Sequence, residues 1–381
     1  MKLRDMAPPA TLKTPLGTIQ ALRGIAALLV VASHGAFVLG PLDSHLYLRN
    51  FLESGAIGVD LFFMISGFIM IYSTWGAGSG RDVLDFLIKR FCRIWPAYLA
   101  WTLVWLMIRD GGISGGPAVD IVKSIFFLPL SIISPPFYGY AALNVGWTLN
   151  YEIQFYLLFA ASMLFGRARW WMLAGAFAVL LVLVPMANGV APALNPYRAA
   201  IFGSALADMA TNPIILEFGF GVVVGWLYLR EHPAPPWRLS AMVMGIVSAV
   251  VVWQLASHVK FGHGFTAWGM TLAPLFVAAA LFEKALRPRI ARWLLWLGEI
   301  SFSLYLSHKI VFFLCARFAP RFEMLRALPG GVLLAIYVTI ALVVASLSTS
   351  ILEKRVSERL RAWALNRGPH SGLSRRVSSA R

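Results

Sequence analysis

Apolar stretches of about twenty residues recur along the whole chain and limit the folds that it can adopt. A helix of this length spans the hydrocarbon core of a bilayer, whereas a soluble domain has no place to bury so much apolar surface. Of the 381 residues, 59% are hydrophobic and only 13% are charged, and the mean hydropathy is +0.72. The sequence therefore predicts an all-α polytopic membrane protein.

The hydropathy pattern predicts about ten transmembrane helices in one domain, residues 19–352. Residues 1–18 are expected to form a cytoplasmic N-terminal segment, and residues 353–381 a basic cytoplasmic tail that is partly disordered. Most of the 33 Lys and Arg residues then fall in cytoplasmic segments, which supports a cytoplasmic location for both termini. The expected spans are residues 19–39, 57–75, 92–108, 146–165, 170–187, 213–230, 239–256, 266–283, 294–315 and 330–352.

The charge and the cysteines exclude several other classes of protein. The formal net charge is +16, but the basic residues are scattered through loops beside apolar segments. Membrane topology and anionic lipid headgroups explain this pattern, so we expect membrane lipids as partners and no nucleic acid. Cys92 and Cys315 are expected at opposite membrane faces, which makes a disulfide between them unfavourable. No spacing typical of metal ligands occurs, and no metal site is predicted.

Arg23 and His34 lie eleven residues apart within one apolar segment. Eleven helical steps of about 100° return to within about 20° of the starting direction, so both side chains share one helix face, about 16 Å apart along the axis. Ionisable side chains within a membrane normally face a protein interior or a wet cavity and mark a functional site. This face of the first span is therefore the first candidate for chemistry.

Three further ionisable residues are expected in the outer half of the membrane, at the depth of His34. They are Asp60 near the start of the second span, Glu152 in the fourth and His308 in the ninth. With His34, these residues are expected to form one cavity that contains imidazoles and carboxylates. Such groups are suited to general acid–base chemistry.

Arg90 and Arg93 are expected at the inner membrane face, beside Arg23. They are three residues apart, so they share a helix face. With Arg23 they are expected to form a cationic opening that is suited to a phosphate-bearing ligand. This arrangement indicates a donor that enters from the cytoplasm and an acceptor on the far side of the membrane. Acyl transfer from coenzyme A to an extracytoplasmic hydroxyl fits it.

Each of these residues also has a structural interpretation. The three arginines are suited to reach lipid headgroups and to set the topology. His34 alone is compatible with a hydrogen bond between helices, and Asp60 with a cap at a helix N-terminus. Glu152 is suited to pair with an arginine or a hydroxyl, and His308 is near enough to the surface to be solvated.

Five segments in order along the chain resemble motifs of the acyltransferase 3 family, the integral-membrane acyltransferases that include O-antigen and exopolysaccharide acetyltransferases. The similarity extends over about residues 16–355. Each motif is weak by itself, but five in register are specific. They are the Arg23 and His34 pair, Gly58–Phe68, Arg90-Phe-Cys-Arg93 with the Ile-Trp-Pro-Ala-Tyr98 that follows, Trp147-Thr-Leu-Asn-Tyr-Glu152 with Thr148 where Ser is usual, and Ser301–His308.

The resemblance implies a multi-pass protein of the cytoplasmic (inner) membrane that transfers an acyl group, in particular acetyl. It implies acyl-CoA, in particular acetyl-CoA, as a co-substrate, and no permanently bound cofactor. The implied acceptor is a hydroxyl of an extracytoplasmic carbohydrate such as an exopolysaccharide, a lipopolysaccharide or a lipid-linked glycan, and polysaccharide-assembly proteins are candidate partners. The resemblance also implies that His34 is catalytic and that Arg23, Arg90 and Arg93 bind the donor.

Two roles remain open for His34 at this point: a general base toward the acceptor hydroxyl, or a nucleophile that carries the acyl group. Glu152 or Asp60 is expected to orient the imidazole and balance its charge. Two other classes of protein share the same intramembrane charges. One is a transporter or flippase for a lipid-linked sugar, and the other is a structural subunit of a polysaccharide-assembly complex.

Overall fold

The computed structural model describes residues 16–40, 46–77, 80–109, 118–230 and 233–366. The described residues form helices and no strand, as the hydropathy pattern predicts. Eight of their helical segments are long and apolar enough to cross a membrane, or nine if a pair bent by 64° at residue 282 is one span. The expected fourth span is a helix of 17 residues, just below that length. Most of the expected N-terminal segment and residues 367–381 of the expected tail lie outside the described residues.

The helices have the following bounds: α1 (Gly17–Gly35), α2 (Leu46–Glu53), α3 (Gly58–Ser73), α4 (Gly80–Ile108), α5 (Ala118–Ile125), α6 (Trp147–Met163), α7 (Arg169–Ala178), α8 (Val184–Ala187), α9 (Ala205–Ala210), α10 (Leu216–Leu229), α11 (Trp237–Ser257), α12 (Met270–Leu281), α13 (Glu283–Leu286), α14 (Arg292–Phe318), α15 (Glu323–Arg326), α16 (Gly330–Ser348) and α17 (Ser357–Asn366). A π-helical segment, η12 (Thr349–Val356), joins α16 to α17 without a break.

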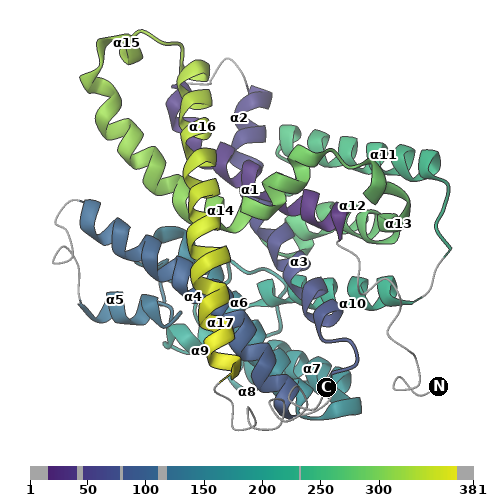
Figure 1. Cartoon of the computed structure of the whole chain (residues 1–381). Helices are drawn as coiled ribbons and strands as arrows, with labels where there is room; N and C mark the ends of the chain where they lie inside the picture. Colours follow the sequence, from purple (N-terminus) through teal and green to yellow (C-terminus); the bar gives the residue numbers. More distant parts are fainter. Residues whose placement is uncertain (1–15, 41–45, 78–79, 110–117, 231–232, 367–381) are drawn as a thin grey trace, which may run out of the picture.

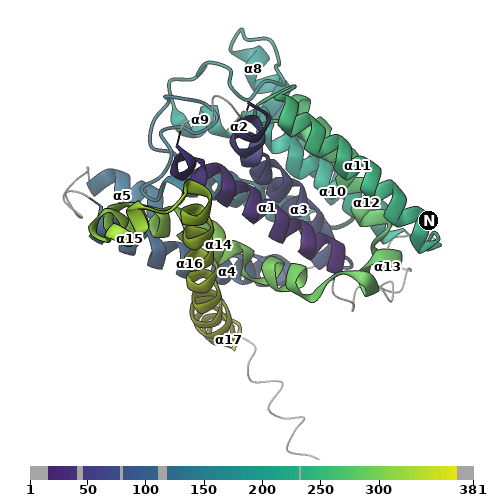
Figure 2. The same ribbon diagram turned by 90° about the horizontal axis from the view of Figure 1, so that it is seen from above.

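Two helices that carry the expected site residues, α1 and α3, lie in the middle of the molecule. Helix α1 packs against both α3 and α14, and α3 packs along α10. Figure 2 shows α10, α11 and α12 on one side of this pair and α14 and α16 on the other. The first and ninth expected spans are thus neighbours, although they are far apart in the sequence (Figure 1).

Glycines let these central helices approach one another closely. A Cβ atom at Gly67 of α3 would lie 1.9 Å from the carbonyl oxygen of Phe218, and one at Gly221 of α10 would lie 1.9 Å from that of Met64. At the contact of α1 with α14, a Cβ at Gly298 would lie 2.0 Å from the carbonyl oxygen of Gln20. Small residues permit such backbone contacts between membrane helices, so these glycines fix how the helices cross.

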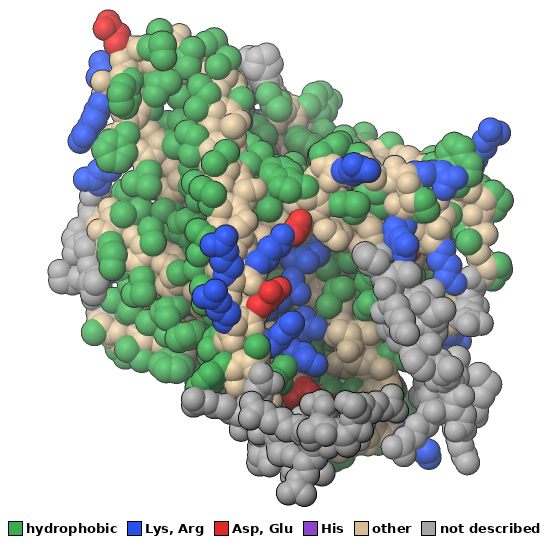
Figure 3. Space-filling view, viewed as in Figure 1, with side chains coloured by type: hydrophobic (Ala, Val, Ile, Leu, Met, Phe, Trp, Pro, Cys, Tyr) green, Lys and Arg blue, Asp and Glu red, His purple; other side chains and the backbone are tan. Residues whose placement is uncertain are grey.

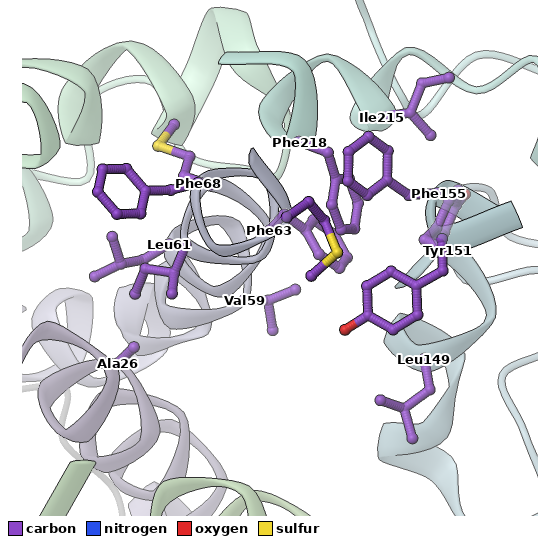
Figure 4. Close-up of a cluster of buried hydrophobic side chains, with 14 of the residues drawn as sticks. Ala26, Val59, Leu61, Phe63, Phe68, Leu149, Tyr151, Phe155, Ile215 and Phe218 are labelled. Carbon is purple, nitrogen blue, oxygen red and sulfur yellow. The ribbon is translucent and has the colours of Figure 1, made fainter. Parts of the chain in front are cut away.

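Aromatic side chains fill the space between α3, α6 and α10 (Figure 4). The ring of Phe218 stacks on Phe63 at 4.6 Å and on Phe155 at 4.7 Å between centroids. Tyr151 lies edge-on to Phe63, and its hydroxyl donates a hydrogen bond to the carbonyl oxygen of Pro136. This packing holds α6, and with it Glu152, against α3.

Candidate active site

The two intramembrane histidines expected from the sequence lie in direct contact. Helix α1 supplies His34 and helix α14 supplies His308, and their ring centroids are 5.0 Å apart. The Nδ1 atom of His34 lies 3.2 Å from the Nε2 atom of His308. The side chain of His308 is completely buried, whereas that of His34 is partly exposed. The pair therefore has one inner member and one member that a substrate can reach.

Backbone carbonyl groups determine which nitrogen of each imidazole carries hydrogen. The Nδ1 atoms of His34 and His308 each lie 3.0 Å from a carbonyl oxygen one helical turn earlier, those of Val30 and Leu304. A carbonyl oxygen only accepts hydrogen bonds, so each Nδ1 is the donor. The Nδ1–H of His34 is then shared between the carbonyl oxygen of Val30 and the Nε2 of neutral His308, which accepts from it. The remaining nitrogen of His34, Nε2, keeps its lone pair, which is the form that a base or a nucleophile requires.

The three arginines expected to bind an anion line one cavity, of about 110 Å³, that we call the arginine cavity. Arg23 enters it from α1, and Arg90 and Arg93 enter it from successive turns of α4. The Nη2 atom of Arg90 donates a hydrogen bond of 2.8 Å to the hydroxyl of Ser73. The cavity wall is otherwise largely apolar, with Phe62, Phe63 and Phe302 among its members. Apolar walls strengthen the attraction of these cations for an anionic ligand.

Glu152 lies in the wall of the arginine cavity and is held by two hydroxyl groups. Its Oε1 atom accepts hydrogen bonds from Tyr156 and, at 2.9 Å, from Ser66. The carboxylate partly balances the charge of the three arginines. Glu152 thus lies with the arginines, and not beside His34 as its expected depth in the membrane predicted.

Tyr305 connects the arginine cavity with the histidine pair. Its ring forms part of the cavity wall and lies 6.1 Å from the ring of His308. Its hydroxyl is fixed at 3.0 Å from the carbonyl oxygen of Val145, to which it donates, and at 2.9 Å from the hydroxyl of Thr148. The cavity and the imidazoles are therefore neighbouring parts of one site.

Asp60 lies apart from this site, which corrects the expectation that it helps to orient His34. It is completely buried, and its two oxygens contact the Nδ1 atom of His263 at 2.7 Å and the backbone N–H of Gly264 at 2.8 Å. The ring of His263 packs against Trp147 and Trp268 at centroid distances of 5.4 and 4.9 Å. Asp60 thus anchors the loop that precedes α12.

The same loop is anchored from a second side by Tyr197. Its hydroxyl oxygen accepts a hydrogen bond of 3.0 Å from the backbone N–H of His263. Desolvation raises the pKa of Tyr197, although its side chain is partly exposed, and the phenol is neutral at physiological pH. Asp60 and Tyr197 therefore hold the loop that precedes α12 from two sides.

Comparison with known proteins identifies the family. A family model described as an acyltransferase domain matches residues 16–352. The chain belongs to the acyltransferase 3 family. The exopolysaccharide production protein ExoZ of Rhizobium meliloti (strain 1021) is 31% identical over 269 residues, which cover 67% of this chain and 75% of ExoZ. The acyltransferase MdmB of Streptomyces mycarofaciens is 28% identical over 341 residues, which cover 80% of each chain.

A third relative carries a named chemistry. The peptidoglycan O-acetyltransferase OatA of Listeria monocytogenes is 23% identical over 338 residues, which cover 76% of this chain and 48% of OatA. The predicted enzyme class is confirmed: the protein is a multi-pass membrane acyltransferase. This finding removes the support for the transporter and structural-subunit interpretations.

Several residues of this acyltransferase were not selected from the sequence. Ser66, Tyr156 and Tyr305 line the arginine cavity. Hydroxyl groups are common in membrane helices, so their presence alone does not mark a site. Tyr305 lies within the Ser301–His308 motif, which was a signal for it. His263 lies outside all five motifs, and only its two flanking glycines indicate a tightly constrained loop.

Proposed function

We propose that this acyltransferase moves an acetyl group from acetyl-CoA, which enters from the cytoplasm, to a hydroxyl group of an extracytoplasmic carbohydrate. One observation carries this proposal: the contact between His34 and His308 adjoins a cavity lined by three arginines. The site therefore combines a basic nitrogen with a binding place for phosphate groups. A thioester of coenzyme A needs both, because its phosphates and its reactive carbonyl lie at opposite ends of a long arm.

Arg23 and His34 support this division of the site. They share a face of α1 and are separated by a helical rise of about 16 Å. A donor whose phosphate end is bound by Arg23, Arg90 and Arg93 has its arm directed along α1 toward Tyr305 and the histidines. Arginines are suited to this role because the guanidinium group binds phosphate oxygens in pairs.

The lone pair on Nε2 of His34 supports a role as general base. It takes the proton of the acceptor hydroxyl while the hydroxyl oxygen attacks the thioester carbonyl. The new carbon–oxygen bond forms, the carbon–sulfur bond breaks, and the leaving thiolate of coenzyme A takes up the proton. His308 accepts from the Nδ1–H of His34 and so keeps Nε2 free for this step.

The names of the relatives support a carbohydrate acceptor. ExoZ is named for exopolysaccharide production and OatA as a peptidoglycan O-acetyltransferase. Both names point to polymers of the cell envelope, and the extracytoplasmic direction of transfer follows from such an acceptor.

The test compares a strain that lacks this protein with strains that carry the wild type or His34→Ala at equal membrane abundance. Proton NMR of surface and secreted glycans measures the O-acetyl signals. We expect these signals to disappear on deletion, to return with the wild type and to remain absent with His34→Ala. Full O-acetylation with His34→Ala contradicts the role of His34. Unchanged glycans after deletion contradict a carbohydrate acceptor.

A second test separates the base from an acyl-carrying histidine. The purified protein is incubated with acetyl-CoA labelled in the acetyl group, without an acceptor. Catalysis by a general base predicts that no label remains on the protein after rapid denaturation. Label on the protein that His34→Ala abolishes contradicts the general base and indicates an acetyl-imidazole intermediate.

A further inference from the structure

A second cavity, of about 310 Å³, lies between α4 and the C-terminal helix α17. We call it the vestibule. It shares Arg90 and Arg93 with the arginine cavity, so the two cavities are consecutive. Figure 3 shows Lys and Arg side chains gathered at the centre of the face on which α4 and α17 lie in Figure 1. The charged residues that line the vestibule are Lys89, Arg90, Arg93, Glu353, Glu358 and Arg361.

The charge of the vestibule favours an anion. Four cationic side chains line it against two carboxylates. Glu353 is already engaged, because its Oε1 atom accepts hydrogen bonds from Ser303 at 2.6 Å and from Thr349 at 3.1 Å. Lys89 and Arg361 are exposed, and both are therefore accessible to a ligand that enters from solvent.

Helix α17 is held in place by its connection to α16. The π-helical segment η12 contains Glu353, which binds Ser303 of α14. One residue before η12, the hydroxyl of Ser348 accepts a hydrogen bond of 3.1 Å from the indole N–H of Trp101 in α4. π-Helical turns are often found at functional sites. Helix α17 follows η12 and places Arg361 in the wall of the vestibule, which Lys89 lines from α4.

We propose that the vestibule binds the phosphate-bearing nucleotide end of the acyl-CoA donor, and that α17 supplies Arg361 as a donor-binding residue. This inference rests on the proposed donor. The diphosphate of the donor then lies at Arg90 and Arg93, which line both cavities, and its arm continues through the arginine cavity, so that the thioester reaches the histidine pair beyond Tyr305. The C-terminal helix is thereby part of the binding site, although it lies beyond the last motif that resembles the family.

The experiment uses the full-length protein in nanodiscs of zwitterionic lipid. It measures the Kd and the transfer rate for acetyl-CoA and for S-acetylpantetheine, which lacks phosphate. A second series uses nanodiscs that contain anionic lipid. We expect Lys89→Ala and Arg361→Ala each to raise the Kd for acetyl-CoA by about tenfold, as for the loss of one charge-assisted contact. The rate at saturating acetyl-CoA and the transfer from S-acetylpantetheine are expected to remain at the wild-type level.

Arg359→Ala is the matched control. It removes the same charge from the same helix, but Arg359 does not line the vestibule, and two helical steps turn it about 200° away from Arg361. We expect it to bind acetyl-CoA like the wild type. Thermal unfolding of all three variants verifies that they are folded.

Three outcomes overturn the inference. If both Lys89→Ala and Arg361→Ala bind acetyl-CoA with wild-type affinity, the vestibule is excluded as a phosphate site. The proposal that acetyl-CoA is the donor is not contradicted by that result. An equal loss with S-acetylpantetheine shows that α17 acts on the fold and not on the phosphates. An effect of Arg361→Ala that requires anionic lipid in the nanodisc assigns the vestibule to lipid headgroups. Failure of the wild type itself to bind acetyl-CoA contradicts the proposed donor.

Discussion

At the scale of single residues, the reactivity of His34 depends on a second imidazole. His308 is completely buried and has its own Nδ1 committed to the carbonyl oxygen of Leu304. Its Nε2 is thus available only as an acceptor, and it orients His34 as the carboxylate does in a serine hydrolase triad. His308 is accordingly a positioning residue that need not touch the substrate.

This orientation predicts different effects for two substitutions of His308. We expect His308→Ala to lower kcat by about tenfold, the effect of losing one orienting hydrogen bond. His308→Gln retains a carbonyl oxygen that can accept from His34, and we expect it to recover part of the rate. Transfer assays with the purified variants at saturating acetyl-CoA measure both. Equal rates for the two variants would argue against orientation by a hydrogen bond.

A substitution of Asp60 is expected to lower the stability of the protein and not its transfer rate, because the contacts of Asp60 are structural. Asp60→Asn removes the charge that faces His263 and weakens the anchor of the loop before α12. We expect a loss of about 2 kcal/mol of stability and a lower Tm in detergent. The transfer rate per folded molecule should stay near that of the wild type. If Asp60→Asn has a normal Tm but a transfer rate as low as that of His34→Ala, Asp60 takes part in catalysis.

The residues show how far the sequence alone reaches. Helical spacing placed Arg23 and His34 on one face of one helix, and the pairs within a single segment, such as Arg90 and Arg93, were predicted to lie together. Contacts between segments depend on packing that spacing does not encode. For this reason His34 and His308 were expected in one group, but the group was expected to include Asp60 and Glu152 as well. Glu152 instead binds Ser66 and Tyr156 beside the arginines.

At the scale of the helices, the crossing of α3 and α10 depends on the absence of two side chains. Gly67→Ala would place a methyl group 1.9 Å from the carbonyl oxygen of Phe218, so the helices must separate. We expect a loss of about 1–3 kcal/mol and a lower Tm and yield. Gly245→Ala in α11 is the control, because a Cβ there meets nothing within 4 Å. A Tm for Gly67→Ala equal to that of the control would show that this crossing tolerates a wider spacing.

The helices themselves were the most predictable part of the fold. Each of the ten apolar segments expected from hydropathy contains a helix among the described residues, because burial in lipid requires it. The irregular pieces were not foreseen. The π-helical segment η12 follows α16 directly, and the chain bends near residue 282, at the end of the eighth expected span. Hydropathy shows where an apolar segment ends, but it does not show whether the helix then continues or bends.

At the scale of the whole molecule, the distribution of Lys and Arg predicts that both termini lie in the cytoplasm. Single cysteines test this in a background with Cys92→Ser and Cys315→Ser. We expect Ala191→Cys, in the exposed loop after α8, to react with a membrane-impermeant maleimide added to intact cells or spheroplasts. Arg359→Cys should react only after the membrane is permeabilised. The reverse pattern would invert the topology and the proposed direction of transfer.

The continuous helical unit of residues 330–365 has a further consequence for the shape of the enzyme in a cell. At about 1.5 Å per residue its 36 residues extend roughly 54 Å, whereas the hydrocarbon core of a bilayer is about 30 Å thick. Even when it is strongly tilted, a helix of this length is longer than the hydrocarbon core. One end therefore extends out of the bilayer as a helix. The end with α17 is the charged one. The last turn of α17 is therefore held at a set distance above the membrane surface.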